Sequence, residues 1–210
     1  MELVLISRSK GIHPETNLVT KMFDLGLSKF HLRKPGFSSS KMKEYLSHIP
    51  EHYWNKIIIH SKHLLAAKYP VGGVHFTKKD RNNQLRLWLL KQYLRKARPG
   101  LIYTTSFHSL ESLTDENKKY SYVFLSPVFN SISKSNYQGK FNNSNFNVYL
   151  KKLKQNVYAL GGIDTDKVSP VFSMGFAGMA VHGSIWKSED PVMKFEEIYN
   201  LCQEQPMCLQ

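Results

Sequence analysis

Two pairs of residues near the end of the chain are the clearest candidates for ligand binding. Gly161-Gly162 follows the apolar run Val157–Leu160, and His182-Gly183 follows a second apolar run, Gly178–Val181. A glycine at the end of a strand lets a ligand approach the backbone N–H groups closely, because no Cβ intervenes. Tight turns alone would also explain each pair. Both pairs together favour a phosphate site, since the loops after strands seven and eight of a (β/α)₈ barrel commonly hold a phosphate.

Basic, hydroxyl and imidazole side chains follow the other predicted strands and suit an anionic ligand. Arg33 offers a planar guanidinium for paired contacts with anionic oxygens, and hydroxyl groups donate hydrogen bonds to phosphate. Asp80 is a carboxylate suited to a hard cation such as Mg²⁺, which usually keeps waters and substrate phosphates as its other ligands. The candidate residues of these kinds are His31, Arg33, Lys34, His60, Asp80, Ser106, His108, Ser131, Ser133 and Lys134.

Each of these residues also has a structural interpretation. His31 and His75 lie inside predicted strands, where a side chain can simply fill a barrel layer. Asp80 can be a helix N-cap, and His108 can cap the helix after the fifth strand. Zinc bound by the histidines is a further alternative. The sequence disfavours it, because the His-x-His on strand one and the strand-eight Asp expected of a barrel metallohydrolase are absent.

Eight short apolar runs, bounded by glycine, proline and polar residues, would position these side chains. Helical patterns fill most of the gaps, and repeated strand–helix–strand units are typical of parallel sheets. The sequence therefore predicts an α/β fold, a compact (β/α)₈ barrel in a single domain over residues 1–210. The predicted strands are Leu3–Ile6, Lys29–Leu32, Lys56–Ile59, Gly73–Phe76, Leu101–Thr104, Tyr122–Leu125, Val157–Leu160 and Met179–Val181.

The predicted helices place their apolar residues on one face. The short connection Ser61–Val71 still has room for two helical turns. The longest irregular stretch, Phe129–Ser144, is polar, and we interpret it as a candidate lid over the catalytic face. The predicted helices are Asn17–Leu25, Ser40–Ile49, Leu85–Leu94, Asp164–Met174 and Val192–Cys202, with a further helix beginning at Ser109.

The composition is that of an ordinary globular protein, with 41% hydrophobic and 21% charged residues. The net charge is +13, but the lysines are scattered and no basic run alternates with aromatic residues. A basic surface that attracts anionic substrates is therefore favoured over nucleic-acid binding. The only two cysteines, Cys202 and Cys208, form no disulfide framework, which fits the cytoplasm. No apolar run is long enough for a signal peptide or a membrane span. The sequence leaves open whether the protein forms a homo-oligomer.

Seven short motifs, taken together and in order, resemble the thiamine phosphate synthase and thiazole tautomerase superfamily. They are FHLRKP, IIIHSK, GGVHFTKKD, SFHS, SPVFNSISK, ALGGI and AVHGSIW, and the resemblance runs from Leu3 to about Tyr199. The synthases join a hydroxymethylpyrimidine pyrophosphate to a thiazole phosphate and release pyrophosphate. The resemblance implies thiazole phosphate at Gly162, His182, Gly183, Ser131 and Ser133, the pyrophosphate at Arg33, Ser106 and Lys134, and Mg²⁺ at Asp80.

The chain departs from the synthase pattern at two places. The stretch that matches HLRKP usually reads QLREK in the synthases, so Pro35 replaces the pyrophosphate lysine, and the neighbouring Lys34 is a candidate substitute. The usual Asn-Asp after strand three is His60-Ser61 here, so Ser61 replaces one of two Mg²⁺ carboxylates. Because Mg²⁺ prefers oxygen ligands, His60 compensates poorly. We expect a weakened magnesium site.

The sequence favours a synthase-like transferase of thiamine biosynthesis, acting on phosphorylated thiazole and the pyrimidine pyrophosphate, with no nucleic-acid or membrane partner. Ser106, His108 and Lys134 are its candidate catalytic residues. One alternative is a thiazole tautomerase-type paralogue, since tautomerases use no pyrophosphate, with His108 or His31 as the proton shuttle. Against it, Pro127 stands where a tautomerase has its catalytic histidine. A catalytically silent thiazole-phosphate-binding protein is a second alternative, and a basic RNA-binding module a remote third.

Overall fold

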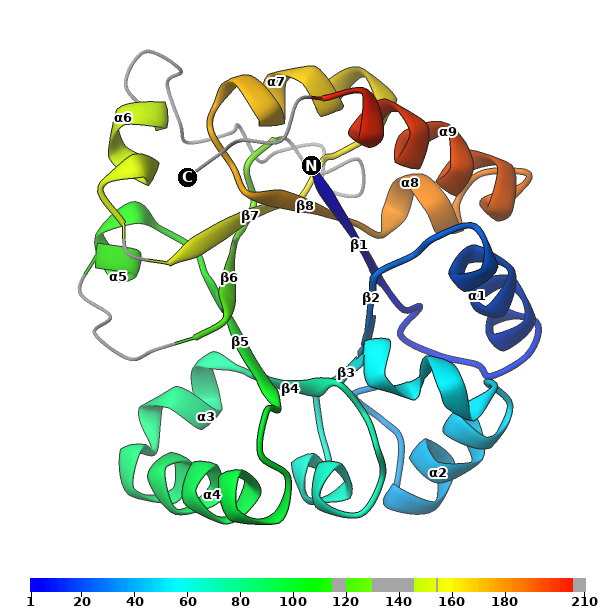
Figure 1. Ribbon diagram of the computed structural model, residues 1–210, viewed down its shortest axis with the longest axis vertical. Coiled ribbons are helices and arrows are strands. Elements are labelled where there is room, and N and C mark those ends of the chain that lie inside the picture. Colours follow the sequence, from blue (N-terminus) through cyan, green and yellow to red (C-terminus); the bar gives the residue numbers. More distant parts are fainter. Residues whose placement is uncertain (115–119, 130–145, 154, 206–210) are drawn as a thin grey trace. The chain divides into compact units, whose positions relative to one another are not determined.

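Eight parallel strands form a closed barrel in which they follow chain order from β1 to β8 (Figure 1). This computed structural model describes residues 1–114, 120–129, 146–153 and 155–205. The (β/α)₈ fold predicted from the sequence is confirmed. The strands are β1 (Glu2–Ile6), β2 (Lys29–Leu32), β3 (Ile57–Ile59), β4 (Gly73–Phe76), β5 (Ile102–Phe107), β6 (Tyr122–Leu125), β7 (Asn156–Leu160) and β8 (Gly178–Val181).

The chain divides into two compact units. One, the N-terminal unit, is Ile6–Thr105; the other, the C-terminal unit, combines Met1–Leu5 with Ser106–Gln210. The single-domain organisation expected from the sequence stays a prediction. Among the described residues, no helix is long and apolar enough to cross a membrane.

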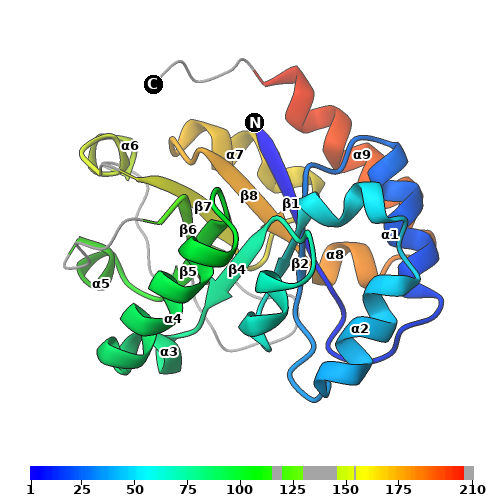
Figure 2. The same ribbon diagram turned by 60° about the horizontal axis from the view of Figure 1, so that its bottom comes forward.

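The N-terminal unit is built on strands that are buried on both faces. β3 consists of three fully buried isoleucines, and it pairs in parallel with β2 and β4. Ser38 caps the helix after β2 by accepting a hydrogen bond from the Lys41 amide, which satisfies an otherwise free N–H. Helices α3 and α4 follow β4 and lie next to each other (Figure 2). Its helices are α1 (Glu15–Asp24), α2 (Ser39–Ser47), α3 (Lys78–Asn82) and α4 (Gln84–Ala97), with 3₁₀ turns η1 (Glu51–Lys56) and η2 (His63–Ala67).

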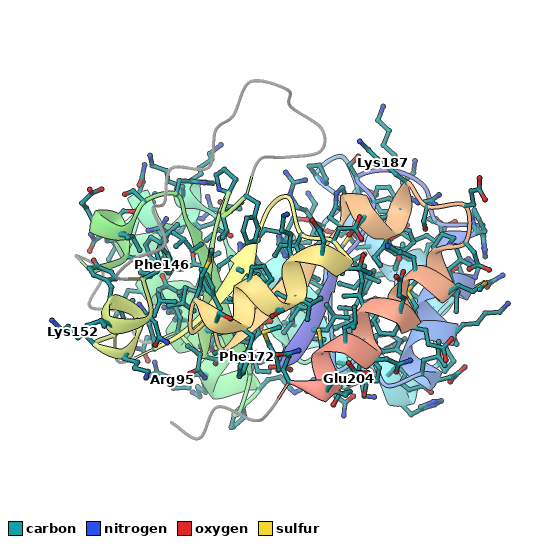
Figure 3. The ribbon with its side chains drawn as sticks, turned by 90° about the horizontal axis from the view of Figure 1, so that it is seen from above. Arg95, Phe146, Lys152, Phe172, Lys187 and Glu204 are labelled. Carbon is teal, nitrogen blue, oxygen red and sulfur yellow. The ribbon has the colours of Figure 1, made fainter. Side chains whose placement is uncertain are left out.

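The C-terminal unit pairs β1 with β8, β8 with β7 and β7 with β6, all in parallel. Its last helix, α9 (Pro191–Glu204), begins after Asp190, whose carboxylate accepts hydrogen bonds from the Val192 and Met193 amides. This helix lies beside α7 and α8 (Figure 3). The other helices are α5 (Leu110–Thr114), α6 (Phe146–Lys151), α7 (Val168–Ser173) and α8 (Gly183–Trp186), with the 3₁₀ turn η3 (Thr165–Lys167).

Most predicted elements agree with the structure to within one or two residues, and the differences have local causes. β5 continues to Phe107, so Ser106 lies inside the strand rather than after it. The helix predicted over Asp164–Met174 divides into η3 and α7, with Asp164 capping the 3₁₀ turn through the Thr165 amide. Apart from Phe129, the candidate lid Phe129–Ser144 lies outside the described residues.

Gly73 marks a close approach between β4 and β5, and it generates a stability prediction. A Cβ at this position would lie 2.3 Å from the carbonyl oxygen of Ile102, which is backbone and cannot rotate away. We expect Gly73→Ala to lower the free energy of unfolding by about 1–3 kcal/mol, the usual range for overpacking. Urea denaturation measures this. Gly36→Ala is the control, because a Cβ there meets no atom within 4 Å. Equal midpoints for the two variants would contradict the prediction.

Candidate active site

One pocket of the N-terminal unit collects the residues that follow β2, β3 and β4. Its volume is about 1120 Å³, and Arg33, His60 and Asp80 all line it. The two positions at which the chain departs from the synthase pattern, Pro35 and Ser61, line the same pocket. The sequence placed these residues at separate strand ends, and the fold brings them together.

The pocket is strongly basic. Its acidic lining residue is Asp80, whereas basic side chains come from α2, α3 and α4, from the end of β2 and from both ends of η2. Such a concentration of one charge attracts anions. Sequence reasoning missed most of these cations, since they are scattered along the chain and only the net charge hinted at them. They are Lys43, Lys62, Lys68, Lys79 and Arg86, in addition to Arg33.

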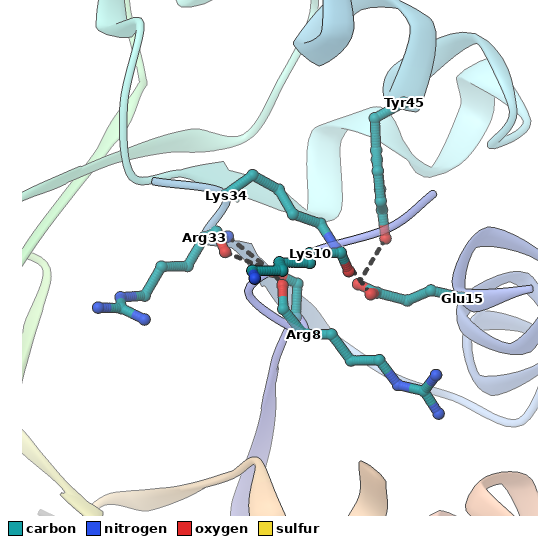
Figure 4. A network of polar contacts seen from close by, with 7 residues as sticks. Arg8, Lys10, Glu15, Arg33, Lys34 and Tyr45 are labelled. Carbon is teal, nitrogen blue, oxygen red and sulfur yellow. Dashed lines mark hydrogen bonds and ion pairs between the residues drawn. The ribbon is translucent and has the colours of Figure 1, made fainter. Parts of the chain in front are cut away.

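Lys34 also lines the pocket, but it differs from these cations because its ammonium group is paired inside the protein core. Its side chain is fully buried, and Nζ donates hydrogen bonds to Glu15 Oε2 at 2.7 Å and to the Lys10 carbonyl at 3.1 Å. Tyr45 Oη donates to the other Glu15 oxygen at 2.8 Å. Figure 4 shows Lys34 directed at Glu15. The ammonium is therefore engaged, and the expected substitution of Lys34 for the missing pyrophosphate lysine is not retained.

Burial affects the ionisation of this network. It raises the pKa of Glu15 and lowers the pKa of Lys34, because leaving water disfavours the charged form of each group. The ion pair and its hydrogen bonds oppose both shifts. Burial also raises the pKa of Tyr45, and the neighbouring Glu15 carboxylate adds to that shift, so Tyr45 stays a neutral donor.

Arg33, one position earlier, points the opposite way from Lys34 (Figure 4). Its amide donates to Ser7 Oγ at 2.8 Å, and that hydroxyl donates to the Arg33 carbonyl at 3.1 Å. These two bonds fix the backbone of Arg33, while its exposed side chain lines the basic pocket. The guanidinium is therefore placed to bind an anion in the pocket.

Asp80 combines a structural role with a possible metal-binding one. Its Oδ2 accepts hydrogen bonds from the Thr77 amide at 2.8 Å and the Thr77 hydroxyl at 2.6 Å, which completes a capping box at the start of α3. The N-cap is thus Thr77, not Asp80 as the structural interpretation had it. Within the described part of the chain, Oδ1 has no hydrogen-bond partner and stays available to a cation.

The residues near Asp80 fit Mg²⁺ only weakly. Ser61 Oγ is buried and has no hydrogen-bond partner among the described residues, so it offers one neutral oxygen. A single carboxylate and a hydroxyl leave most coordination positions to waters and substrate phosphates, an arrangement that Mg²⁺ tolerates. The weakened magnesium site expected from the sequence stays a prediction.

Three histidines of β2, β3 and β4 form a cluster beside the pocket, which we call the histidine cluster: His31, His60 and His75. His31 Nδ1 lies 2.8 Å from His60 Nε2, and the rings of His60 and His75 stack with centroids 4.0 Å apart. His31 and His75 are buried, whereas His60 is partly exposed and lines the pocket.

The histidine cluster is held in its neutral form. Burial lowers the pKa of all three imidazoles, to about 3 for His75, since an imidazolium would lose its hydration there. Neighbouring histidines and Arg33 add to the shift, because further positive charge repels a proton. Asp80 opposes it for His75. The interpretation of His31 and His75 as inert filling of a barrel layer does not explain their mutual contacts.

The C-terminal unit carries the glycine pairs. β7 and β8 are neighbours in parallel register, with Leu160 opposite Ala180, so Gly162 and Gly183 follow at the same edge of the sheet, as the sequence predicted. Gly162 has a φ of 68°, a backbone conformation that L side chains rarely adopt. A Cβ added at Gly183 would meet nothing within 4 Å. A ligand can therefore approach the backbone at this edge.

Two backbone hydrogen bonds hold the loop after β6 against the end of β7. The Val128 amide donates to the Leu160 carbonyl at 3.0 Å, and the Phe129 amide donates to the Gly161 carbonyl at 3.1 Å. The structure thus describes this loop as far as Phe129. Ser131, Ser133 and Lys134, which were predicted to bind the two phosphate groups, lie outside the described residues.

The remaining candidate residues also belong to the C-terminal unit. His108 is exposed, and its Nδ1 donates to the Ser126 carbonyl at 2.8 Å, so it does not cap the following helix. His182 is exposed and directly precedes α8, and Ser106 is partly buried in β5. Sequence reasoning missed Ser184, whose buried hydroxyl has no hydrogen-bond partner among the described residues; its position after His182-Gly183 was the available signal.

Comparison with known proteins adds an independent line of argument. A profile of the thiamine monophosphate synthase family matches residues 3–185. The chain is 26% identical over 201 residues to the thiamine-phosphate synthase of Lysinibacillus sphaericus, covering 90% of each chain. It is 25% identical over 198 residues to that of Flavobacterium psychrophilum, covering 90% of this chain and 93% of the relative.

Solved structures share the fold. The thiamine phosphate pyrophosphorylase of Bacteroides thetaiotaomicron matches with a TM-score of 0.79 and 24% identity, over 98% of this chain and 100% of that one. That of Pyrococcus furiosus matches with a TM-score of 0.76 and 20% identity, over 97% and 96% of the two chains. At these identities, the structures support a common architecture.

The Lys34–Glu15 pair predicts a large loss of stability on Lys34→Met. The variant leaves the buried Glu15 carboxylate without its counter-charge, which typically costs about 3–5 kcal/mol. Urea denaturation measures the loss. Lys41→Met is the control, because Lys41 is exposed on α2. Lys34→Met with Glu15→Gln should recover part of the loss, since a neutral amide needs no counter-charge. A Lys34→Met protein as stable as the control would refute the role of the pair.

The histidine cluster predicts that stability falls with acidity. The pKa values of the three histidines are lower in the folded chain than in the unfolded chain, where histidine has a pKa of about 6.5. The contribution of the neutral histidines to the free energy of unfolding is therefore complete above about pH 6.5. It is lost as the pH falls toward the pKa values of the folded chain. Each histidine contributes a slope of up to about 1.4 kcal/mol per pH unit.

Urea denaturation between about pH 7 and pH 5 measures this slope in the native protein and in His60→Asn, which removes one of the three imidazoles. We expect a shallower slope in His60→Asn. His48→Asn is the control, because His48 is exposed on the surface. An unchanged slope in His60→Asn would show that the acid sensitivity arises elsewhere.

Proposed function

Because the chain belongs to the thiamine monophosphate synthase family, we propose that it is a synthase-like transferase that couples hydroxymethylpyrimidine pyrophosphate to thiazole phosphate. One observation carries this proposal most directly. The basic pocket gathers Arg33 and Asp80, the residues assigned to the pyrophosphate and its cation, in one place. A pyrophosphate group brings several negative charges, which this pocket is suited to neutralise.

The proposed reaction is a displacement at the pyrimidine methylene carbon. The thiazole nitrogen supplies the electron pair for the new C–N bond. The C–O bond to pyrophosphate breaks, and pyrophosphate leaves with the electron pair of that C–O bond. Arg33 and the pocket lysines stabilise the negative charge that develops on the leaving oxygens. Electrostatic stabilisation of this kind is usually the largest single contribution to catalysis. Ser106 and Lys134 assist there by resemblance to the synthases. Mg²⁺, held by Asp80, would neutralise further pyrophosphate charge when bound.

Thiazole phosphate is proposed to bind at the C-terminal unit. Gly162 and Gly183 would present backbone N–H groups to the phosphate, with His182 beside them. Ser131 and Ser133 are assigned to the same phosphate by resemblance. We add Ser184, because its hydroxyl lacks a partner in the described part of the chain. Backbone donors of this kind do not depend on the two positions at which the chain departs from the synthases.

A tautomerase-type activity is the second candidate, and specific observations favour it. Lys34 is engaged by Glu15, so it does not supply the pyrophosphate lysine that Pro35 replaces. His108 has Nε2 available for proton transfer, because its Nδ1 is bound to the Ser126 carbonyl. A catalytically silent thiazole-phosphate-binding protein is the third candidate. It would keep the glycine site without turnover.

The setting of the protein is part of the same proposal. We expect a cytoplasmic location, in keeping with Cys202, which is a free and buried thiol. Partners would be the two phosphorylated substrates rather than nucleic acid, because the pocket concentrates the basic residues around a concave site suited to small anions. Homo-oligomer formation stays an open expectation.

Isothermal titration with each substrate tests the proposal. Pro35 and Ser61 each replace a charged contact that is worth about 1.5–3 kcal/mol, so the pyrimidine pyrophosphate should bind at least roughly tenfold more weakly per loss. Thiazole phosphate needs neither position, so it should bind much the tighter and independently of Mg²⁺. Weak binding of thiazole phosphate, or binding that requires Mg²⁺, would contradict the assignment of its site.

A double variant separates the synthase from its rivals. Pro35→Lys with Ser61→Asp restores the synthase residues in the pocket and should raise turnover to thiamine phosphate in the presence of Mg²⁺. The control pair, Asn82→Lys with Ser40→Asp, makes the same charge changes at exposed positions outside the pocket. No turnover by the restored variant, together with tautomerase activity in the parent, would favour the second candidate.

A further inference from the structure

We propose that His31, His60 and His75 bind a divalent transition-metal ion, of which zinc is the physiological example, at a site separate from the Asp80 carboxylate. The three imidazoles come from three consecutive strands of the N-terminal unit. One ring nitrogen of each lies within 4.8 Å of the others. This is the group of potential metal-binding side chains that the described residues bring together.

The spacing of the nitrogens is close to what one ion requires. Two ligands of a tetrahedral zinc ion lie about 3.3 Å apart, given Zn–N bonds of about 2.0–2.1 Å. His31 Nδ1 and His60 Nε2 are slightly closer, at 2.8 Å, because a proton now joins them. On metal binding, that proton would move to the other nitrogen of its own ring, so both imidazoles would stay neutral ligands, and the two coordinating nitrogens would move apart by a few tenths of an ångström. The third nitrogen would have to move inward by small ring rotations.

A hydrogen bond outside the cluster orients the His75 ring, so that its unprotonated nitrogen faces the proposed ion. His75 Nδ1 lies 2.8 Å from Thr104 Oγ1, a buried hydroxyl on β5. We assign the ring proton to this bond, which leaves Nε2 of His75 as the ligand atom. A second hydrogen bond that orients a ligating histidine in this way is the usual support of metal sites. The lowered pKa values of the three histidines keep their lone pairs free of protons near neutral pH.

The chemistry of the donors selects the class of ion. Three imidazole nitrogens suit zinc, cobalt, nickel and copper, whereas Mg²⁺ requires oxygen ligands. The sequence patterns of barrel metallohydrolases place ligands on strands one and eight. The histidine cluster lies on β2, β3 and β4 instead, so it does not match those patterns. The absence of those motifs therefore does not exclude a metal here.

The site would have an open coordination position. Three protein ligands and one open position distinguish catalytic zinc sites from structural ones, which are fully ligated by protein. His60 lines the basic pocket, so the open position faces a space lined by Arg33 and Lys62. Water or an anionic group of a ligand in the pocket is the fourth donor that this position would accept.

Titration of metal-free protein with Co²⁺ tests the site directly. Cobalt replaces zinc in nitrogen sites, and tetrahedral Co²⁺ absorbs visible light far more strongly than octahedral Co²⁺. We expect one ion per chain, an intense visible spectrum, and displacement of Co²⁺ by Zn²⁺ but not by Mg²⁺. No substrate is present, so failure of the proposed synthase reaction would leave this result unaffected, and the reverse also holds.

Variants assign the ligands. His60→Asn removes one ligand at a partly exposed position, and we expect affinity to fall by at least about 100-fold, since even outer-shell changes cost 10–100-fold. Thr104→Val should weaken binding by about 10–100-fold without abolishing it. Asp80→Asn, which removes the candidate Mg²⁺ carboxylate, should still bind one Co²⁺ ion per chain with the intense visible spectrum. Circular dichroism confirms that each variant is folded.

The matched control is the surface pair His13 and His48, whose Nε2 atoms lie 3.3 Å apart at exposed positions. His48→Asn breaks this exposed histidine pair and should leave the spectrum and the affinity unchanged. The proposal is overturned if the native protein binds no Co²⁺, if the bound ion is octahedral, or if His48→Asn rather than His60→Asn abolishes the signal.

Discussion

The buried ion pair between Lys34 and Glu15 constrains the whole N-terminal part of the site. A charge that is removed from water must be compensated by a partner, and Glu15 is held in turn by Tyr45. This network joins the end of β2 to α1 and α2. Arg33 and Lys34 are adjacent and point in opposite directions, so anchoring Lys34 in the core helps to hold Arg33 toward the pocket. The direction of one buried ammonium group thereby sets the direction of the neighbouring guanidinium.

In the proposed function, the two units recognise anions with different kinds of groups. In the C-terminal unit the donors are backbone amides after β7 and β8, whose placement depends on glycine conformation. In the N-terminal unit they are side chains, and a single substitution changes their number and type. The departures from the synthase pattern, Pro35 and Ser61, both fall in the N-terminal pocket. A site made of side chains is chemically easier to alter than one made of backbone.

The sequence predicted the barrel and most strand boundaries, because buried parallel strands such as the isoleucines of β3 are continuous apolar runs with sharp ends. It also placed Arg33, His60 and Asp80 at strand ends that the fold unites. It did not predict that Lys34 would be buried, since its partner Glu15 lies 19 residues earlier. The convergence of the three histidines was equally hidden, because it depends on the register of three strands. Side-chain direction and long-range pairing were not visible in the local pattern.

The opposite directions of Arg33 and Lys34 have a consequence for how function is transferred between distant relatives. An alignment that shifts a basic residue by one position appears conservative, since the charge and the neighbourhood are kept. At these two positions that shift carries the charge from the pocket side to the core side, where it acquires an internal partner. Selection would then preserve such a lysine for reasons unrelated to catalysis. In this region of the chain, the odd or even position of a residue is more informative than its chemical type.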